Sequence, residues 1–189
     1  MNLFDKFMFA KQISFTDGQI TLLGQPIALL PVKLISLYTQ SIIDDQVELN
    51  KFYYASKDSV KADFGITVGK LYGFSFKDFT RWFVDMANLA GWGRLHFEAI
   101  EQQGHRGVIV SENCPVGSML KGVVSKPCDH FLRGMMAGGA SSAFRENVDF
   151  IETECVAVED PKCRFLMGSR AELGAKFPDI VKEQLGLLR

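Results

Sequence analysis

The chain lacks an excess of charge of either sign. Its 189 residues include 21 Lys and Arg against 22 Asp and Glu, for a net charge of −1, and no long run of one sign occurs. Proteins that bind nucleic acid usually carry a basic excess or a basic stripe, because they neutralise phosphates. The composition therefore argues against nucleic acid as a partner.

Long apolar runs are also missing. No segment approaches the roughly 18 consecutive apolar residues that a membrane-spanning helix needs. In the N-terminal stretch, Asp5 and Lys6 interrupt what would have to be the continuous apolar core of a signal peptide. We therefore expect no membrane span and a cytoplasmic location. In that reducing compartment the four cysteines are better explained as thiols or metal ligands than as disulfides.

No internal repeat, linker or low-complexity tract divides the chain. Hydrophobic residues make up 47% and charged residues 23%, an ordinary globular balance, so we expect a single domain over residues 1–189. Within it, residues 1–30 read as an N-terminal strand and hairpin region. Asp17-Gly18 between two short apolar runs predicts a two-residue hairpin turn.

The remaining periodicity predicts an α+β fold, an antiparallel sheet packed with several helices. Strands and helices do not alternate regularly, which argues against a doubly wound parallel sheet. The spacing of apolar residues and the turn signals predict a third short strand at 27–30, helices over about 32–46, 48–71, 75–89, 128–143 and 170–187, and strands over about 94–102, 107–111, 148–158 and 164–167. Gly134-x-x-x-Gly138 in the small-residue helix indicates tight helix packing or a dimer face.

Metal-ligating residue types gather in the C-terminal half of the chain. Cys128, Glu152, Cys155 and Cys163 are three thiols and a carboxylate, a donor set that suits a tetrahedral zinc site. Their spacing is not that of a zinc finger, so it also fits buried inert thiols. If residues 158–160 form a three-residue loop, Cys155 and Cys163 lie opposite each other with Cβ atoms roughly 5 Å apart.

Glu152 is harder to place at such a site. It lies three residues before Cys155, so on a regular strand its side chain points to the opposite face. A contribution from Glu152 therefore requires a bulge or twist between the two residues. His130 is an alternative fourth ligand, although it does not share a helix face with Cys128.

Residues 107–167 hold a motif-bearing core that resembles the vinyl-4-reductase domain family of small-molecule-binding domains. The resemblance lies in the segments Pro127-Cys128-Asp129-His130-Phe131, Glu152-Thr153-Glu154-Cys155 and Asp160-Pro161-Lys162-Cys163-Arg164-Phe165, with Gly134 and Gly138 between them. The chain departs from the family pattern at Glu159, where Gly is usual. It departs again at Asn113-Cys114-Pro115, where the family has Asn-Ser-Pro.

This resemblance implies a fold, a metal and a dimer. Relatives include the aromatic-sensing domains of bacterial phenol- and toluene-responsive activators, in which an upstream Cys, a Glu and two further Cys bind zinc. These positions match Cys128, Glu152, Cys155 and Cys163 here. The fold is similar to that of the vesicle-tethering TRAPP subunits, which are α+β, dimeric and contain an apolar channel. Four protein ligands leave no open coordination position, so the zinc would be structural.

Aromatic residues are abundant, with 16 Phe, 4 Tyr and 2 Trp, many of them in the middle third. Core packing explains each one singly, but together they also fit an apolar cavity for a hydrophobic ligand. The candidates for ligand contact are Phe79, Trp82, Phe83, Trp92 and His96. On an alternating strand, the His96 ring can instead point to solvent.

These observations favour a zinc-containing domain that binds a small hydrophobic or aromatic molecule, acts as a regulatory sensor and reports through a homodimer or a downstream regulatory protein. One alternative is an enzyme or accessory factor in tetrapyrrole-type reduction, since other relatives accompany bacteriochlorophyll synthesis. However, no Gly-x-Gly-x-x-Gly fingerprint of a redox cofactor occurs. The other alternative is an interaction scaffold permanently filled with lipid.

Overall fold

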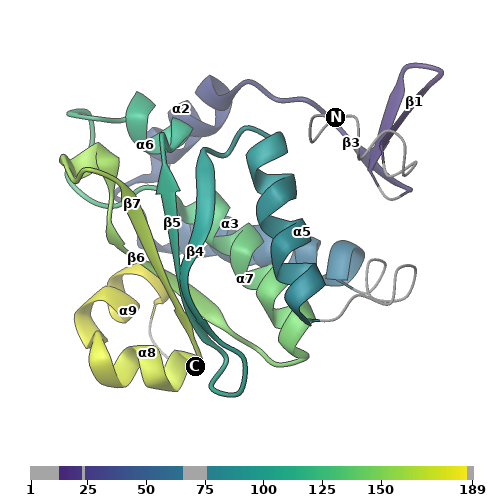
Figure 1. Ribbon diagram of the computed structural model, residues 1–189. Coiled ribbons are helices and arrows are strands. Elements are labelled where there is room, and N and C mark those ends of the chain that lie inside the picture. The colour runs from purple at the N-terminus through teal and green to yellow at the C-terminus, as the bar shows by residue number, and fades with distance from the viewer. Residues whose placement is uncertain (1–12, 23, 66–75, 187–189) are drawn as a thin grey trace.

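The computed structural model describes residues 13–22, 24–65 and 76–186, and these form seven α-helices and two antiparallel sheets (Figure 1). The main sheet has the order β4-β5-β7-β6. Its strands are β4 (Arg94–Glu101), β5 (Arg106–Glu112), β6 (Asp149–Glu154) and β7 (Cys163–Gly168). The α+β antiparallel fold expected from the sequence is confirmed.

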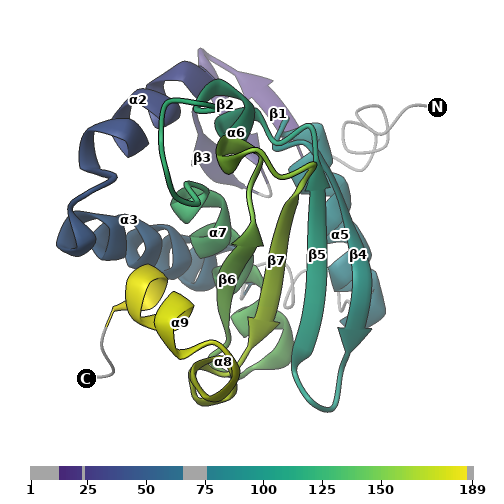
Figure 2. The same ribbon diagram turned by 90° about the vertical axis from the view of Figure 1, so that its left-hand side faces the viewer.

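Helices cover one face of the main sheet and one of its edges. The helices α3 (Gln46–Ser59), α5 (Phe76–Leu89) and α7 (His130–Phe144) enclose the main core with the sheet, while α8 (Arg170–Lys176) and α9 (Pro178–Leu185) lie beside β6 and β7 (Figure 2). The other helices are α2 (Val32–Ile42) and α6 (Pro115–Met119). None of the helices in the described ranges is long and apolar enough to cross a membrane.

The small N-terminal sheet packs against helix α5. Its strands are β1 (Ile13–Thr16), β2 (Gln19–Leu22) and β3 (Gln25–Ile27), joined in that order. Asp17 and Gly18 both have positive φ, at 51° and 76°, as a type I′ hairpin turn requires. Leu22 then packs with Trp82 and Met86 in a second apolar cluster, so α5 is buried on two sides.

Two glycines of α7 allow it to approach α3 closely. A Cβ atom on Gly134 would lie 2.4 Å from the carbonyl oxygen of Tyr53, and one on Gly138 would lie 2.3 Å from that of Lys57. Both distances are below any ordinary contact, so only glycine permits this approach. The small-residue motif therefore serves tight helix packing within the chain.

A buried ion pair lies under this helix crossing. Lys57 Nζ and Asp149 Oδ1 are 2.6 Å apart, and both side chains are almost completely buried. The Tyr53 hydroxyl donates to the same carboxylate oxygen at 2.8 Å. These contacts fix α3 to the first residue of β6.

In the described part of the chain, no strand pairs with the outer edge of β6, and side chains satisfy its backbone instead. The Gln184 amide accepts from the Glu152 N–H at 2.8 Å and donates to the Glu152 carbonyl at 2.7 Å. The fully buried Arg133 donates to the Phe150 carbonyl at 3.0 Å. The edge is therefore closed to pairing with another chain.

Several expected boundaries were wrong. The third strand is Gln25–Ile27 rather than 27–30, and the closing helix is two helices, because the residue before Pro178 is disfavoured in the helical region. The strand predicted over 148–158 ends at Glu154 and is followed by a 3₁₀ turn, Val156–Val158. Helix α6 was not predicted. The expected helix over 48–71 extends as a π-helix, Val60–Gly65, and its end lies outside the described residues.

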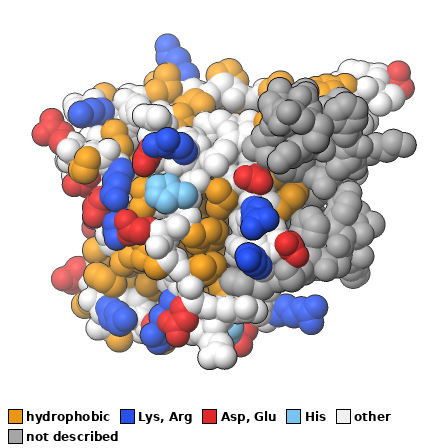
Figure 3. All heavy atoms as spheres, viewed as in Figure 1, with side chains coloured by type: hydrophobic (Ala, Val, Ile, Leu, Met, Phe, Trp, Pro, Cys, Tyr) orange, Lys and Arg blue, Asp and Glu red, His pale blue; other side chains and the backbone are white. Residues whose placement is uncertain are grey.

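The surface charge is mixed, as the composition predicts. On the described part of the face in Figure 3, basic and acidic side chains are interspersed with apolar ones. Ion pairs between elements, such as Arg164 on β7 with Glu98 on β4 and Arg106 on β5 with Glu172 on α8, also bring opposite charges together. No basic stripe is formed by the side chains visible there.

Candidate metal centre and apolar cavity

One end of the main sheet holds a cluster of buried thiols and carboxyl groups. Cys128 and Asp129 lie just before α7, Glu152 lies on β6, Cys155 directly follows β6 and Cys163 begins β7. All five side chains are at most 2% exposed. The segment before α7 therefore meets the β6–β7 pair, which follows more than twenty residues later in the sequence.

A β-bulge turns Glu152 toward the cluster. Glu152 pairs with Phe165 and Glu154 pairs with Arg164, so Thr153 is an extra residue on β6. This extra residue reverses the alternation of side chains between Glu152 and Cys155. The bulge that the sequence required for a shared site is confirmed.

The loop between the two later cysteines differs from the predicted three-residue turn. Its backbone folds back on Cys155, whose N–H donates to the Asp160 carboxylate at 2.7 Å and whose carbonyl accepts from Val158 and Asp160. Glu159 takes a left-handed conformation with φ 75°. This left-handed conformation usually favours glycine, but here a glutamate adopts it.

The distances between sulfur atoms suit one tetrahedral ion. Cys128 Sγ lies 3.8 Å from Cys155 Sγ, and Cys155 Sγ lies 4.0 Å from Cys163 Sγ. Two thiolates bound to one tetrahedral ion at about 2.3 Å are about 3.8 Å apart. Each of these two pairs of thiols is spaced as two ligands of such an ion would be, and Cys155 is common to both pairs.

The structure adds two residues that the sequence reasoning did not assign to the cluster. Asp129 Oδ2 lies 3.3 Å from Cys163 Sγ, and Cys114 Sγ lies 3.2 Å from both Asp129 oxygens. The ligand atoms of Asp129, Glu152, Cys155 and Cys163 all lie within 4.8 Å of one another, and this set could hold a metal ion. The sequence signals for Asp129 were its place next to Cys128 and within the motif segment Pro127–Phe131.

The acidic groups of the cluster are strongly perturbed. Burial and the neighbouring Asp129 hold the pKa of Glu152 well above its ordinary value, and burial raises the pKa of Asp129 to about 6. Hydrogen bonds from Cys128 and Cys163 lower the pKa of Cys155. The geometry thus gathers acidic groups that cannot all ionise together unless a cation is bound.

Two buried polar atoms beside the cluster have no hydrogen-bond partner among the residues that the structure describes. The Glu152 Oε2 atom accepts from the Asp129 N–H at 3.0 Å, whereas Oε1 has no partner. His130 Nδ1 is also without one, and burial lowers the pKa of this histidine to about 3, so its ring is neutral. An unpartnered buried carboxylate oxygen is costly, and a metal ion would satisfy it.

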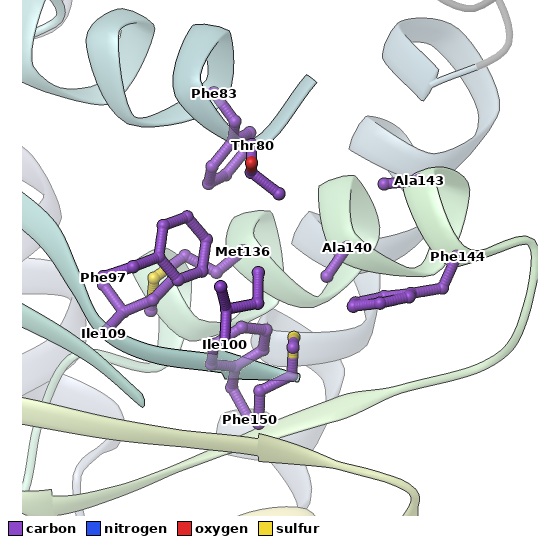
Figure 4. Close-up of a pocket in the computed structure, with 11 residues that line it drawn as sticks. Thr80, Phe83, Phe97, Ile100, Ile109, Met136, Ala140, Ala143, Phe144 and Phe150 are labelled. Carbon is purple, nitrogen blue, oxygen red and sulfur yellow. The ribbon is translucent and has the colours of Figure 1, made fainter. Parts of the chain in front are cut away.

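A small apolar cavity of about 20 Å³ lies farther along the same elements (Figure 4). Its walls come from α5, α7 and the strands of the main sheet. The described residues that line it are Thr80, Phe83, Phe97, Ile100, Ile109, Met136, Ala140, Ala143, Phe144, Phe150 and Met167.

Of the residues expected to contact a ligand, Phe83 lines this cavity. Trp82 packs against the N-terminal sheet, and Trp92 packs on Phe131 with ring centroids 5.2 Å apart. His96 is exposed on β4. The side chain of Phe79 lies outside the described part of the chain.

Comparison with known proteins was made by sequence and by structure. No family model and no curated protein matches the sequence. The phenol-responsive sensory domain of the transcription activator PoxR, solved with phenol, matches with a TM-score of 0.74 at 19% identity over 100% of this chain and 98% of that one.

Two further solved structures match over part of the chain. A vinyl-4-reductase family protein from Methanocaldococcus jannaschii has a TM-score of 0.49 at 18% identity, covering 75% of this chain and 82% of that one. A trafficking protein particle complex subunit 3 from Naegleria fowleri, covalently bound to palmitic acid, has a TM-score of 0.47 at 11% identity. The match covers 72% of this chain and 93% of that one. Relatives of these kinds were expected from the sequence motifs, and the fold of the described residues is similar to that of the PoxR sensory domain.

Proposed function

We propose that this chain is a zinc-braced sensor domain that binds a small hydrophobic molecule in the cavity between α5, α7 and the main sheet. The observation that carries the proposal is that the cluster and the cavity share three elements. Asp129 directly precedes helix α7, which lines the cavity with Met136, while β6 contributes Glu152 and Phe150 and β7 contributes Cys163 and Met167. A ligand that moves these elements also affects the cluster.

Zinc is the metal that the donor set favours. Thiolates with one carboxylate suit tetrahedral zinc, and harder ions such as magnesium prefer all-oxygen sites. Cys128, Glu152, Cys155 and Cys163 would hold the ion, which closes the coordination shell and makes its role structural. Asp129 lies close enough to compete with Cys128 for the fourth position, given its 3.3 Å distance from Cys163. The bound ion would hold the start of α7 against the β6–β7 strand pair.

The metal content of purified protein tests the zinc centre. Protein prepared without chelators or a histidine tag should carry about one zinc per chain by elemental mass spectrometry, and Cys163→Ser should lose it and unfold at lower temperature. Cys114→Ser is the matched control, because this buried cysteine contacts Asp129 but lies outside the proposed ligand set. Cys128→Ser and Asp129→Asn, compared in the same way, show which of the two completes the site. Folded wild-type protein without metal would refute the zinc centre.

Binding of one-ring aromatic compounds tests the sensor. The PoxR domain was solved with phenol, and its fold covers this whole chain, which supports an aromatic ligand here. At least one such compound should bind with a one-to-one stoichiometry in a calorimetric titration. If none binds at millimolar concentration, the sensor proposal is refuted even where zinc is present.

The output would pass through a second copy or a separate regulatory protein. Apolar side chains exposed on α2 support a partner surface, among them Leu34 at 54% and Leu37 at 53% exposure. Light scattering on the zinc-loaded protein should therefore show a dimer. If the protein is a monomer at all concentrations tested, a separate regulatory protein is the remaining route for the output.

A further inference from the structure

The walls of the cavity offer a ligand almost no hydrogen bond. Among its described lining residues, ten have side chains without a strong donor or acceptor, and Thr80 has the one hydroxyl. That hydroxyl already donates to the Lys77 carbonyl oxygen within the same helix, at 3.0 Å. A polar group on a ligand would therefore meet carbon and thioether sulfur.

The same walls are rich in groups that favour an aromatic ring. Phe83, Phe97, Phe144 and Phe150 approach the cavity from α5, β4, α7 and β6, as Figure 4 shows. Aromatic rings prefer offset or edge-to-face contacts with one another. The thioether sulfurs of the two lining methionines also interact favourably with rings.

The size of the cavity limits the ligand to one ring. A volume of about 20 Å³ holds no more than a water-sized sphere, whereas an engineered cavity of about 150 Å³ is known to take benzene. Room must therefore come from side chains that move. Met136 and Met167 are unbranched and can change rotamer at little cost, and Phe83 is only partly buried, so these movements can make room for a ligand of about one ring.

We infer that the cavity selects a one-ring aromatic hydrocarbon without a hydroxyl group over a phenol. This inference rests on the proposed sensor function and names its ligand class. A phenol entering the cavity would leave its hydroxyl without a partner, and a buried hydroxyl without a hydrogen bond is disfavoured. A methyl group in the same position loses nothing, because it is buried against apolar neighbours.

Toluene and phenol form a matched pair for the test, because they differ by a methyl and a hydroxyl of similar size. Isothermal titration of the zinc-loaded protein should give a dissociation constant for phenol at least tenfold higher than that for toluene. Phenol that binds as tightly as toluene, or more tightly, overturns the inference and leaves the sensor proposal standing. Failure of both compounds to bind overturns the inference together with the sensor proposal.

A substitution shows whether the measured binding occurs in this cavity. Ala140 lines it from α7, so Ala140→Leu should fill it and weaken toluene binding at least tenfold. Ala175→Leu on α8 is the control, because Ala175 is exposed and is not among the lining residues, and it should leave toluene binding unchanged. Toluene binding that survives Ala140→Leu places the ligand elsewhere and overturns the inference. The selectivity itself is decided by the ratio of the dissociation constants for phenol and toluene on the unaltered chain. That ratio does not depend on how well the variant folds.

Discussion

The crossing of α3 and α7 allows a sharp test of the packing that supports both sites. Replacing Gly138 with alanine would place a Cβ atom 2.3 Å from the Lys57 carbonyl oxygen and 2.9 Å from Val60 Cβ. Ordinary carbon–oxygen contacts are about 3.3–3.6 Å, so the helices would have to separate by roughly 1 Å. Overpacking usually costs about 1–3 kcal/mol, and we expect about 2–3 kcal/mol here because the clash is with a backbone oxygen rather than a flexible side chain, while alanine returns about 1 kcal/mol of helix propensity. We expect a net loss of about 1–2 kcal/mol in the free energy of unfolding.

Urea denaturation followed by circular dichroism measures this loss, on zinc-loaded samples of equal metal content. In a separate thermal melt, the melting temperature should fall by about 2–8 °C for a domain of this size. Gly174→Ala on α8 is the matched control, because its Cβ would lie 4.0 Å from the nearest side-chain atom, Val181 Cγ1. It should raise stability by about 0.5–1 kcal/mol. A Gly138→Ala variant as stable as the unaltered chain would refute the close approach of the two helices.

Two further predictions concern charged groups. Lys57→Met leaves the Asp149 carboxylate buried without its cation and should destabilise the fold by about 3 kcal/mol in urea denaturation, whereas Lys51→Met, in an exposed pair, should leave the free energy of unfolding almost unchanged. Hydrogen bonds from Arg106 and Ser169 lower the pKa of Glu172 to about 2, below its unfolded value of about 4.3. This group therefore contributes stability above about pH 4.3 that is lost as the pH falls toward 2. Thermal melts at pH 6 and pH 3 should show a smaller acid-induced decrease for Glu172→Gln than for the unaltered chain, and equal decreases would contradict this assignment.

Local features of the chain could be predicted because their causes are local. The Asp17-Gly18 turn requires two positive φ angles, and few dipeptides accept both. The pairing of residues 94–101 with 106–112 follows from alternation on each side of a short turn. The need for a bulge between Glu152 and Cys155 follows from the two-residue repeat of a strand.

Helix ends and short helices were harder to predict. Helix α6 has five residues, which is too short for a periodic pattern, and Pro115 at its start reads equally well as a strand terminator. The break at Phe177-Pro178 was missed because the apolar spacing continues across it. In both places a single residue decided the backbone conformation.

The three thiols and the carboxylate of the proposed zinc centre could be named from the sequence, because their residue types and motif positions limit the choice. The presence of Asp129 and Cys114 in the same cluster was decided by the tertiary structure, since it depends on where the start of α7 meets β7.

The tertiary structure also decided which aromatic residues line the cavity. Their number indicated an apolar cavity, but the N-terminal sheet packs on Trp82 and His96 is exposed, so Phe83 is the expected contact that lines it among the described side chains.

The sequence by itself determined residue chemistry, short-range turns and the periodicity of each element, because these depend on neighbours within a few positions. The tertiary structure decided which side chains share a volume, because that depends on how separate elements pack. The cavity is lined from α5, β4, β5, α7, β6 and β7, and no local pattern links six elements that are spread over nearly half of the chain. Packing at this range is set by the whole core, and so the polarity of the cavity could be read only from the fold.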